Sequence, residues 1–224
     1  MRLNKYLALH MGISRREADE IIERGKVRIN NDLDILGSRV EDGDIVTVND
    51  KKLSSDTQYA YIALNKPVEY VCSRRQQGDT PTIYELLPAE LRNLKTVGRL
   101  DKNSSGLILL TNDGDFAYQM THPKFAKVKM YKLVLDKELE PSHQQMINGP
   151  GVELPDGVSK ITLTKDPDNG ARYWTATMKE GRNRQIRRTF GELGYEVVEL
   201  HRIIFGDYAL NDIKPGEYKY ISIH

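Results

Sequence analysis

The segment Gly98-Arg99-Leu100-Asp101-Lys102-Asn103-Ser104-Ser105-Gly106 runs directly into Leu107-Ile108-Leu109-Leu110, and this junction decides the fold of most of the chain. Four consecutive apolar residues without polar alternation predict a strand that is buried on both faces. The polar residues before it predict a turn. Asp101 is therefore expected at a strand end, where a rigid scaffold can present a carboxylate to a pocket. The alternative is a capping or turn role, which is commoner for an aspartate in a polar turn.

Further strand-like runs lie on both sides of this segment, at 61–64, 129–135, 173–178 and 196–200. A helix is predicted at 185–193, because Ile186, Phe190 and Leu193 would bury one of its faces. This mixture predicts an α+β domain around a mixed, mainly antiparallel sheet. The polar residues that precede it are typical of a linker. We therefore expect a domain at 59–224, preceded by a linker at 51–58.

The first fifty residues form a separate unit in the sequence pattern. Apolar residues from Leu3 to Met11 recur at helical spacing, and Ser14 with Glu17 has the Ser-x-x-Glu spacing of a capping box at the start of a second helix. Gly25 is placed to end that helix, and alternation at 26–30 predicts a strand that can pair with another at 44–48. Residues 1–50 are therefore predicted to form two helices and a small sheet.

Two cations occupy an unusual position in this unit. Arg15 and Arg16 stand in the first turn of the second helix, where positive charge opposes the helix macrodipole. A phosphate bound there, with Lys26 and Arg28 on the following strand, would offset this cost. The alternative is a solvated basic face, which is equally compatible with the spacing.

Composition places the chain among ordinary globular proteins and excludes several classes of site. Of 224 residues, 39% are hydrophobic and 29% are charged, and the net charge is +1. Cations nevertheless cluster at 121–135 and 179–188, which favours local contacts with phosphates. The single Cys72 cannot form an internal disulfide, and no His or Cys cluster predicts a metal site. No apolar run is long enough to span a membrane, so a cytoplasmic location is expected.

The first unit resembles the alpha-L RNA-binding module of a ribosomal small-subunit protein and of tyrosyl-tRNA synthetases. The resemblance runs through Arg2-Leu3-Asn4-Lys5-Tyr6-Leu7, Ser14-Arg15-Arg16-Glu17-Ala18 and Gly25-Lys26-Val27-Arg28-Ile29-Asn30. The usual Val-Asn-Gly turn becomes Ile29-Asn30-Asn31, and asparagine tolerates the left-handed conformation that such a turn needs. The resemblance implies RNA binding by the basic residues of the module, namely Arg2, Lys5, Arg15, Arg16, Lys26 and Arg28.

The second domain resembles the ribosomal RNA pseudouridine synthases, in the branch built like the ribosomal small-subunit uridine synthase. Three segments carry the resemblance: 98–114, the Lys66-Pro67 pair, and Glu180-Gly181-Arg182-Asn183-Arg184-Gln185-Ile186-Arg187-Arg188 followed by 198–202. Ser104 stands where threonine is more usual and keeps the hydroxyl group. Glu69 replaces the glycine of the family's Lys-Pro-x-Gly. A backbone conformation that requires glycine at this position would be strained by a glutamate.

This resemblance implies the conversion of a specific uridine in ribosomal RNA to pseudouridine, with Asp101 as the catalytic carboxylate on a flipped-out uridine. It implies that Arg187 pairs with Asp101, keeping the carboxylate ionised and oriented, and that Tyr131 stacks on the base. Without the resemblance, Tyr131 would be interpreted as a core aromatic residue. Further contacts are expected from Leu200 and Arg99 to the substrate, and from Arg184 and Arg188 to RNA.

Because the reaction is an isomerisation, neither a cofactor nor a metal is expected. The expected partner is ribosomal RNA or a ribosome assembly intermediate, and the expected state is a monomer, since no heptad pattern indicates self-association. One alternative is a non-catalytic RNA-binding or ribosome-assembly factor, which would not need Asp101. A weaker alternative is a hydrolase with paired carboxylates, for which Asp113 and Asp115 are better interpreted as a turn or helix start.

Overall fold

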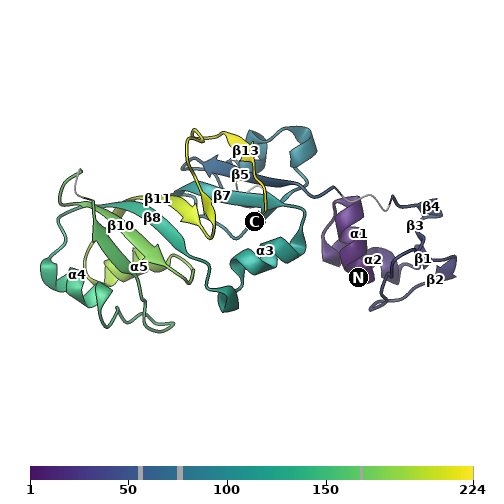
Figure 1. The fold of residues 1–224 in the computed structure, drawn as a ribbon, viewed down its shortest axis with the longest axis horizontal. Coiled ribbons are helices and arrows are strands. Elements are labelled where there is room, and N and C mark those ends of the chain that lie inside the picture. Colours follow the sequence, from purple (N-terminus) through teal and green to yellow (C-terminus); the bar gives the residue numbers. More distant parts are fainter. Residues whose placement is uncertain (55–57, 75–77, 167–168, 224) are drawn as a thin grey trace. The chain divides into compact units, whose positions relative to one another are not determined.

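The computed structural model describes residues 1–54, 58–74, 78–166 and 169–223. The chain divides into two compact units (Figure 1), of which unit 1 is Met1–Ala60 with Ala89–Lys95 and unit 2 is Tyr61–Pro88 with Thr96–His224. Residues 55–57 of the predicted linker lie outside the described residues. The first two linker residues, Lys51–Lys52, form strand β4 instead, because they pair with the preceding strand.

Unit 1 packs two short helices on one side of a small antiparallel sheet (Figure 1). The helices are α1 (Leu3–Met11) and α2 (Arg15–Glu23), and the strands run in the order β2 (Asp32–Leu33), β1 (Val27–Ile29), β3 (Val46–Val48) and β4. The apolar residues of both helices meet those of β1 and β3 in one core, which contains Leu3, Leu7, Ala18, Ile22, Val27, Ile29, Val40, Val46 and Val48. The predicted two helices and small sheet are confirmed.

Local signals in unit 1 act as the sequence predicts. The Ser14 hydroxyl accepts a hydrogen bond from the Glu17 N–H at 3.1 Å, and the Glu17 carboxylate accepts one from the Ser14 N–H at 2.7 Å. This capping box satisfies amides that the first helical turn leaves without partners. Asn30 and Asn31 have φ values of 52° and 76°, so the turn between β1 and β2 uses the left-handed conformation expected of asparagine.

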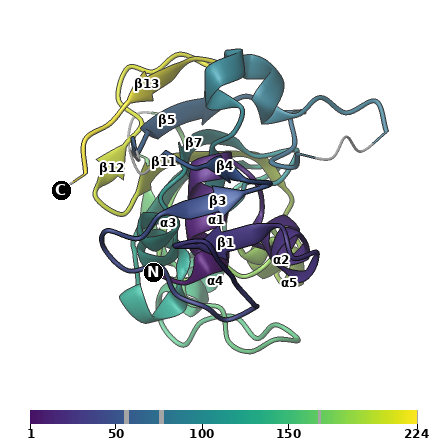
Figure 2. The ribbon, with the colours of Figure 1, turned by 90° about the vertical axis from the view of Figure 1, so that its right-hand side faces the viewer.

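Unit 2 is built around a long mixed sheet. Figure 2 shows β13, β5 and β7 side by side at one edge of it. The strands run in the order β13 (Tyr218–Tyr220), β5 (Tyr61–Lys66), β7 (Ser105–Thr111), β11 (Val197–Phe205), β8 (Lys129–Leu135), β10 (Tyr173–Met178) and β9 (Thr162–Lys165). Two short strands pair outside this order, β6 (Lys95–Val97) with β7 and β12 (Tyr208–Ala209) with β11.

Strand orientation agrees with the prediction of a mixed, mainly antiparallel sheet. In the order from β13 to β9, β7 and β11 are parallel and the other neighbours are antiparallel. Leu107 to Leu110 of β7 are each no more than 1% exposed, which confirms that this run is buried on both faces. Leu107 and Leu109 pack with Met120 and Phe205 in one core cluster. The apolar run that follows Asp101 is therefore a buried interior strand of the unit.

Short helices complete unit 2. These are α3 (Gly114–Thr121), α4 (Pro141–Asn148) and α5 (Gln185–Glu192), with the 3-10 helices η1 (Ile83–Leu86) and η3 (Pro123–Phe125). A third 3-10 helix, η2 (Ala89–Leu91), belongs to the segment that is grouped with unit 1. Asp113 caps α3 by accepting the N–H groups of Asp115 and Phe116, which confirms a helix start there. Within the described residues, each helix is too short or too polar to cross a membrane.

The parallel joint between β7 and β11 depends on one glycine. Gly106 is paired with Arg202 and has a φ of +99°, a conformation that L side chains rarely adopt. A Cβ atom added at Gly106 would lie 2.2 Å from the Arg202 carbonyl oxygen and 2.6 Å from its nitrogen. Both contacts are with backbone, so no side chain can move aside to relieve the clash. The glycine after the polar turn therefore permits the two strands to meet.

We predict that Gly106→Ala lowers the free energy of unfolding by about 3 kcal/mol, because it adds both a left-handed alanine and a backbone clash. The matched control is Gly114→Ala, since Gly114 begins α3 without a positive φ and its added Cβ would meet open space. Urea denaturation of both variants measures the change. Equal stability of the two variants would contradict the assigned joint between β7 and β11.

Candidate active site

Unit 2 contains a pocket of about 800 Å³ that is lined by residues of β8 and β11 and of the turn before β7. Asp101 lines this pocket together with four other residues predicted from the sequence, namely Arg99, Tyr131, Arg184 and Leu200. These residues come from the turn before β7, from β8, from the start of α5 and from β11. The sheet thus brings together side chains that lie up to a hundred positions apart in the sequence.

Asp101 lies in the turn between β6 and β7, as the sequence predicts. The Ser104 N–H donates to the Asp101 carbonyl oxygen at 3.1 Å, which closes the turn, and the Asp101 side chain is 33% exposed. Its carboxylate is 3.7 Å from Nη1 of Arg184. Arg184 immediately precedes α5 and has a φ of 47°. The acid is therefore open to the pocket and has a cation beside it.

Arg187 does not have the position that the family resemblance implies. Its Nη2 atom donates to the Asn103 carbonyl oxygen at 2.8 Å, and its Nη1 atom donates to the Val197 carbonyl oxygen. Burial lowers the pKa of Arg187, and the nearby Asp101 carboxylate opposes that shift. The expected pairing is thus corrected: Arg184 is the ion-pair partner of Asp101. Arg187 is held by two carbonyl groups and connects the turn to β11.

Tyr131 and Leu200 form part of the pocket wall, and both are almost fully buried, at 8% and 7% exposure. Arg202, also in the wall, is a buried residue to which sequence analysis assigned no role. Its Nε atom donates to the Leu107 carbonyl oxygen at 2.7 Å, and its guanidinium carbon lies 6.0 Å from the centre of the Tyr131 ring. Its Nη2 atom is buried without a hydrogen-bond partner among the described residues. Arg202 could have been predicted as a site residue from its place in the motif at 198–202.

Lys66 binds the backbone of the turn that carries Asp101. The sequence analysis noted its Lys-Pro motif but did not predict Lys66 as a site residue. The side chain is fully buried, and its Nζ atom donates to the carbonyl oxygens of Ser104 at 2.6 Å, Pro67 at 2.9 Å and Lys102 at 3.4 Å. Burial lowers the pKa of Lys66 from 10.5 to about 8, although the charges of nearby acids oppose the shift. A buried cation thus fixes the backbone that follows Asp101.

The departure at Glu69 is accommodated without a glycine. Glu69 has a φ of 69°, so the backbone adopts the left-handed conformation with a glutamate in place. Its N–H donates to the Lys102 carbonyl oxygen at 2.8 Å, and its carboxylate lies 3.0 Å from the Lys102 ammonium group. These contacts compensate for the cost of a left-handed side-chain residue. The Glu69 segment is thereby attached to the turn that carries Asp101.

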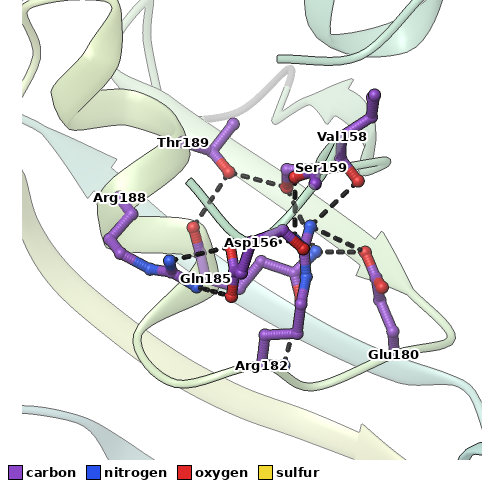
Figure 3. A network of polar contacts seen from close by, with 9 residues as sticks. Asp156, Val158, Ser159, Glu180, Arg182, Gln185, Arg188 and Thr189 are labelled. Atoms are coloured by element: carbon purple, nitrogen blue, oxygen red, sulfur yellow. Dashed lines mark hydrogen bonds and ion pairs between the residues drawn. The ribbon is translucent and has the colours of Figure 1, made fainter. Parts of the chain in front are cut away.

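Two cations near the pocket are paired with Asp156 (Figure 3). Arg188 forms a bidentate pair with the Asp156 carboxylate, with both N–O distances at 2.9 Å, and this lowers the pKa of Asp156. Arg182 contacts the same carboxylate at 3.0 Å and donates to the carbonyl oxygens of Gly157 and Val158. Arg188, predicted to contact RNA, is therefore held in an internal ion pair in this structure.

The same network fastens α5 to the loop at 156–159. Gln185 and Thr189 of α5 hydrogen-bond the Ser159 hydroxyl at 3.1 and 2.7 Å (Figure 3), and all three residues are buried. Gln185 also donates to Glu180. The N-terminal end of α5, which follows Arg184, is therefore held by hydrogen bonds to Ser159 and to Glu180. No group of three or more His, Cys, Asp or Glu side chains in the described ranges could hold a metal ion.

The predicted RNA-binding residues of unit 1 are distributed over its surface. Arg15 and Arg16 are exposed directly after the Ser14 cap. Arg28 is exposed on β1 and lies 3.9 Å from the Asp50 carboxylate. The remaining three are exposed or half-buried, namely Arg2, Lys5 and Lys26. The unit therefore offers several cations to solvent.

Comparison with known proteins finds a family match for each of the two units. A profile described as RNA pseudouridylate synthase matches residues 60–192, and the S4 domain profile matches residues 1–52. The chain is 32% identical to the ribosomal small subunit pseudouridine synthase A of Vibrio parahaemolyticus, over 99% of this chain and 96% of the relative. It is also 32% identical to the ribosomal large subunit pseudouridine synthase B of Buchnera aphidicola, over 100% and 94% of the two chains. A crystal structure of a pseudouridylate synthase matches with a TM-score of 0.70 and 32% identity, over 99% and 96% of the two chains.

Lys66 should make stability depend on pH. Because its folded pKa is about 8 against 10.5 unfolded, the unfolded chain holds an extra proton between these values. The free energy of unfolding should therefore rise with pH across this window, by up to about 3 kcal/mol, relative to Lys66→Met. Urea denaturation of both proteins at several pH values measures this difference. The exposed Lys214→Met is the control, and a pH-independent difference for Lys66→Met would contradict the lowered pKa.

Proposed function

The chain belongs to the RNA pseudouridylate synthase family, and we propose that it converts a specific uridine of ribosomal RNA to pseudouridine with Asp101 as the catalytic carboxylate. The relatives named above are pseudouridine synthases of the small and of the large ribosomal subunit. Ribosomal RNA is therefore the substrate class that the family membership favours.

The observation that carries this proposal is the setting of Asp101. It is the acid of the motif at 98–107, it lines the pocket, and its side chain is open to solvent at one-third of its surface. Arg184 at 3.7 Å provides a positive charge beside the carboxylate and can orient it. The carbonyl contacts of Lys66 and Arg187 hold the turn in place from two sides. A carboxylate positioned in this way can attack or deprotonate a substrate without first being reorganised.

The chemistry needs little besides such a group. The bond between the ribose C1′ and uracil N1 breaks, the base rotates, and C1′ rejoins the base at C5. The C5 proton leaves and N1 gains a proton, so substrate and product have the same composition. Asp101 serves as the nucleophile or as the base toward the ribose. A nucleotide that fills the pocket would exclude water, which would otherwise intercept the severed glycosidic bond.

The pocket is suited to a nucleotide turned out of its stack. A volume of about 800 Å³ falls within the range of small-molecule sites. Tyr131 offers an aromatic ring and Leu200 an apolar surface to the base. The unpartnered Nη2 atom of Arg202 is a donor suited to a uracil carbonyl group. Turning the nucleotide out costs a few kcal/mol, which these contacts would offset.

Unit 1 would bind the RNA that surrounds the target. The S4 domain match and the exposed Arg15 and Arg16 support this role. Cations on a surface bind the phosphate backbone with little preference for sequence and a strong dependence on salt. Affinity would thus come largely from unit 1, while the pocket of unit 2 performs the reaction.

We predict that Asp101→Asn lowers the rate of pseudouridine formation by about 10³-fold or more, because an amide cannot replace an essential carboxylate. RNA affinity should remain close to that of the parent. The assay is carbodiimide-dependent primer extension on small- and large-subunit ribosomal RNA, with fluorescence anisotropy for binding.

Asp212→Asn is the matched control, because Asp212 is an acid whose side chain is 80% exposed and which is outside the pocket lining. It should retain full activity. If Asp101→Asn modifies RNA as fast as the parent, Asp101 is not the catalyst. If the parent itself forms no pseudouridine while binding RNA, the chain is instead an RNA-binding or assembly factor.

Replacing Arg15 and Arg16 by glutamine should weaken RNA binding and flatten its salt dependence. Each lost phosphate contact should lower the slope of log K against log salt by about 0.7 to 0.9. Titrations at several salt concentrations measure the slope. The control replaces the exposed Lys214 and Lys219 of unit 2 by glutamine, which makes the same change in charge. An equal effect of both double variants would show a loss of general charge rather than of a site.

A further inference from the structure

An aromatic cluster with one cation stands beside the pocket, and the proposed reaction does not use it. Tyr118 of α3 and Phe125 of η3 are 45% and 39% exposed. Their ring centres are 5.8 Å apart at 90°, and the His122 ring lies 4.7 Å from Tyr118 and 6.4 Å from Phe125. Single exposed aromatic residues are ordinary, whereas three rings in mutual contact form a continuous surface. We call Tyr118, His122, Lys124 and Phe125 the rim platform.

Lys124 gives this surface a positive charge. Its Nζ atom lies 5.0 Å from the centre of the Tyr118 ring and 4.7 Å from that of Phe125. Within the described ranges, no carboxylate lies within ion-pair distance of this ammonium group. Its contacts are therefore with the rings and with solvent, and a long flexible side chain can leave the rings for a stronger anionic partner.

The backbone holds the platform in a defined shape. The His122 Nδ1 atom accepts the Lys124 N–H at 3.2 Å, and the Ala126 N–H donates to the Pro123 carbonyl oxygen at 3.0 Å. Ala126 has a φ of 46°, a left-handed conformation that is uncommon for a residue other than glycine. Strained conformations of this kind concentrate at functional positions. The hydrogen bonds at 122–126 thus hold Phe125 of η3 against Tyr118 of α3.

The platform is continuous with the pocket of Asp101. Thr121, His122 and Pro123 line that pocket, and the His122 ring packs against both exposed aromatic rings. Lys127, which follows directly in the chain, also lines the pocket. A nucleic acid strand whose uridine enters the pocket would therefore have its neighbouring nucleotides at this rim.

We propose that the rim platform binds an unpaired nucleotide next to the target uridine, with its base on Tyr118 and Phe125 and a phosphate on Lys124. This inference rests on the proposed function, because it assumes that the pocket receives a uridine. Aromatic surfaces combined with cations are the usual means of holding single-stranded nucleic acid, and every base offers a face for stacking. A phosphate would draw Lys124 away from the rings and free their faces for the base. The platform would thus keep the substrate strand open next to the flipped nucleotide.

The test uses the full chain and two probes of about twelve nucleotides, a single-stranded oligouridylate and an abasic strand of the same length. Tyr118→Ala with Phe125→Ala should raise the Kd for oligouridylate by about fivefold or more, and should leave the Kd for the abasic strand within about twofold. Lys124→Gln should weaken both probes and flatten the salt dependence. Tyr220→Ala, a 65% exposed aromatic residue outside the pocket lining, is the matched control and should change neither.

Kinetics on ribosomal RNA separate this inference from the proposed function. The double alanine variant should raise KM by about fivefold with kcat nearly unchanged, and Tyr118→Phe with Phe125→Tyr should restore KM. An inactive parent would overturn the proposed function. The platform proposal would be overturned if the parent is active and the double alanine variant keeps both its affinity for oligouridylate and its KM. This face would then be assigned to a protein partner. An equal loss of affinity for both probes would also overturn it, since stacking requires bases.

Discussion

The close approach of Gly106 to Arg202 is the contact on which the arrangement of unit 2 depends. It joins β7 to β11 in parallel and thereby connects the strands β13 and β5 with the strands β8, β10 and β9. The Arg202 side chain adds a second link, from its Nε atom to the Leu107 carbonyl oxygen. Because the turn of Asp101 immediately precedes this joint, its position relative to the wall of Tyr131 is fixed by the sheet rather than by flexible loops.

Around that joint, cations serve two distinct purposes. Lys66 and Arg187 bind backbone carbonyl groups and hold the turn, whereas Arg184 faces the carboxylate itself. Hydrogen bonds from charged donors are stronger than neutral ones, and burial increases the cost of losing them. The turn can therefore remain ordered although it consists mostly of small polar residues. Its stability comes from side chains that approach it from other elements.

The sequence predicted the features that depend on neighbouring residues. The capping box at Ser14, the left-handed turn at Asn30 and the buried run before Thr111 all follow from local patterns, and the family motif added the pocket position of Asp101. The sequence motif paired Asp101 with Arg187, whereas the ion pair in the structure is with Arg184, a residue with a positive φ just before α5. The pairing of Arg188 with Asp156 and the burial of Lys66 join distant segments, and composition carries no record of such contacts.

The pairing of Asp156 with two arginines also shapes the electric field in front of the enzyme. It neutralises one of the five positive charges of the 179–188 segment, whereas Arg99 lies at the pocket and Arg184 faces Asp101 there. A polyanion approaching this face would meet less positive charge beside Asp156 than beside the other cations of the segment. Such a gradient guides a strand during diffusion and acts before any specific contact forms. One exposed aspartate can therefore influence where along this surface an RNA first binds.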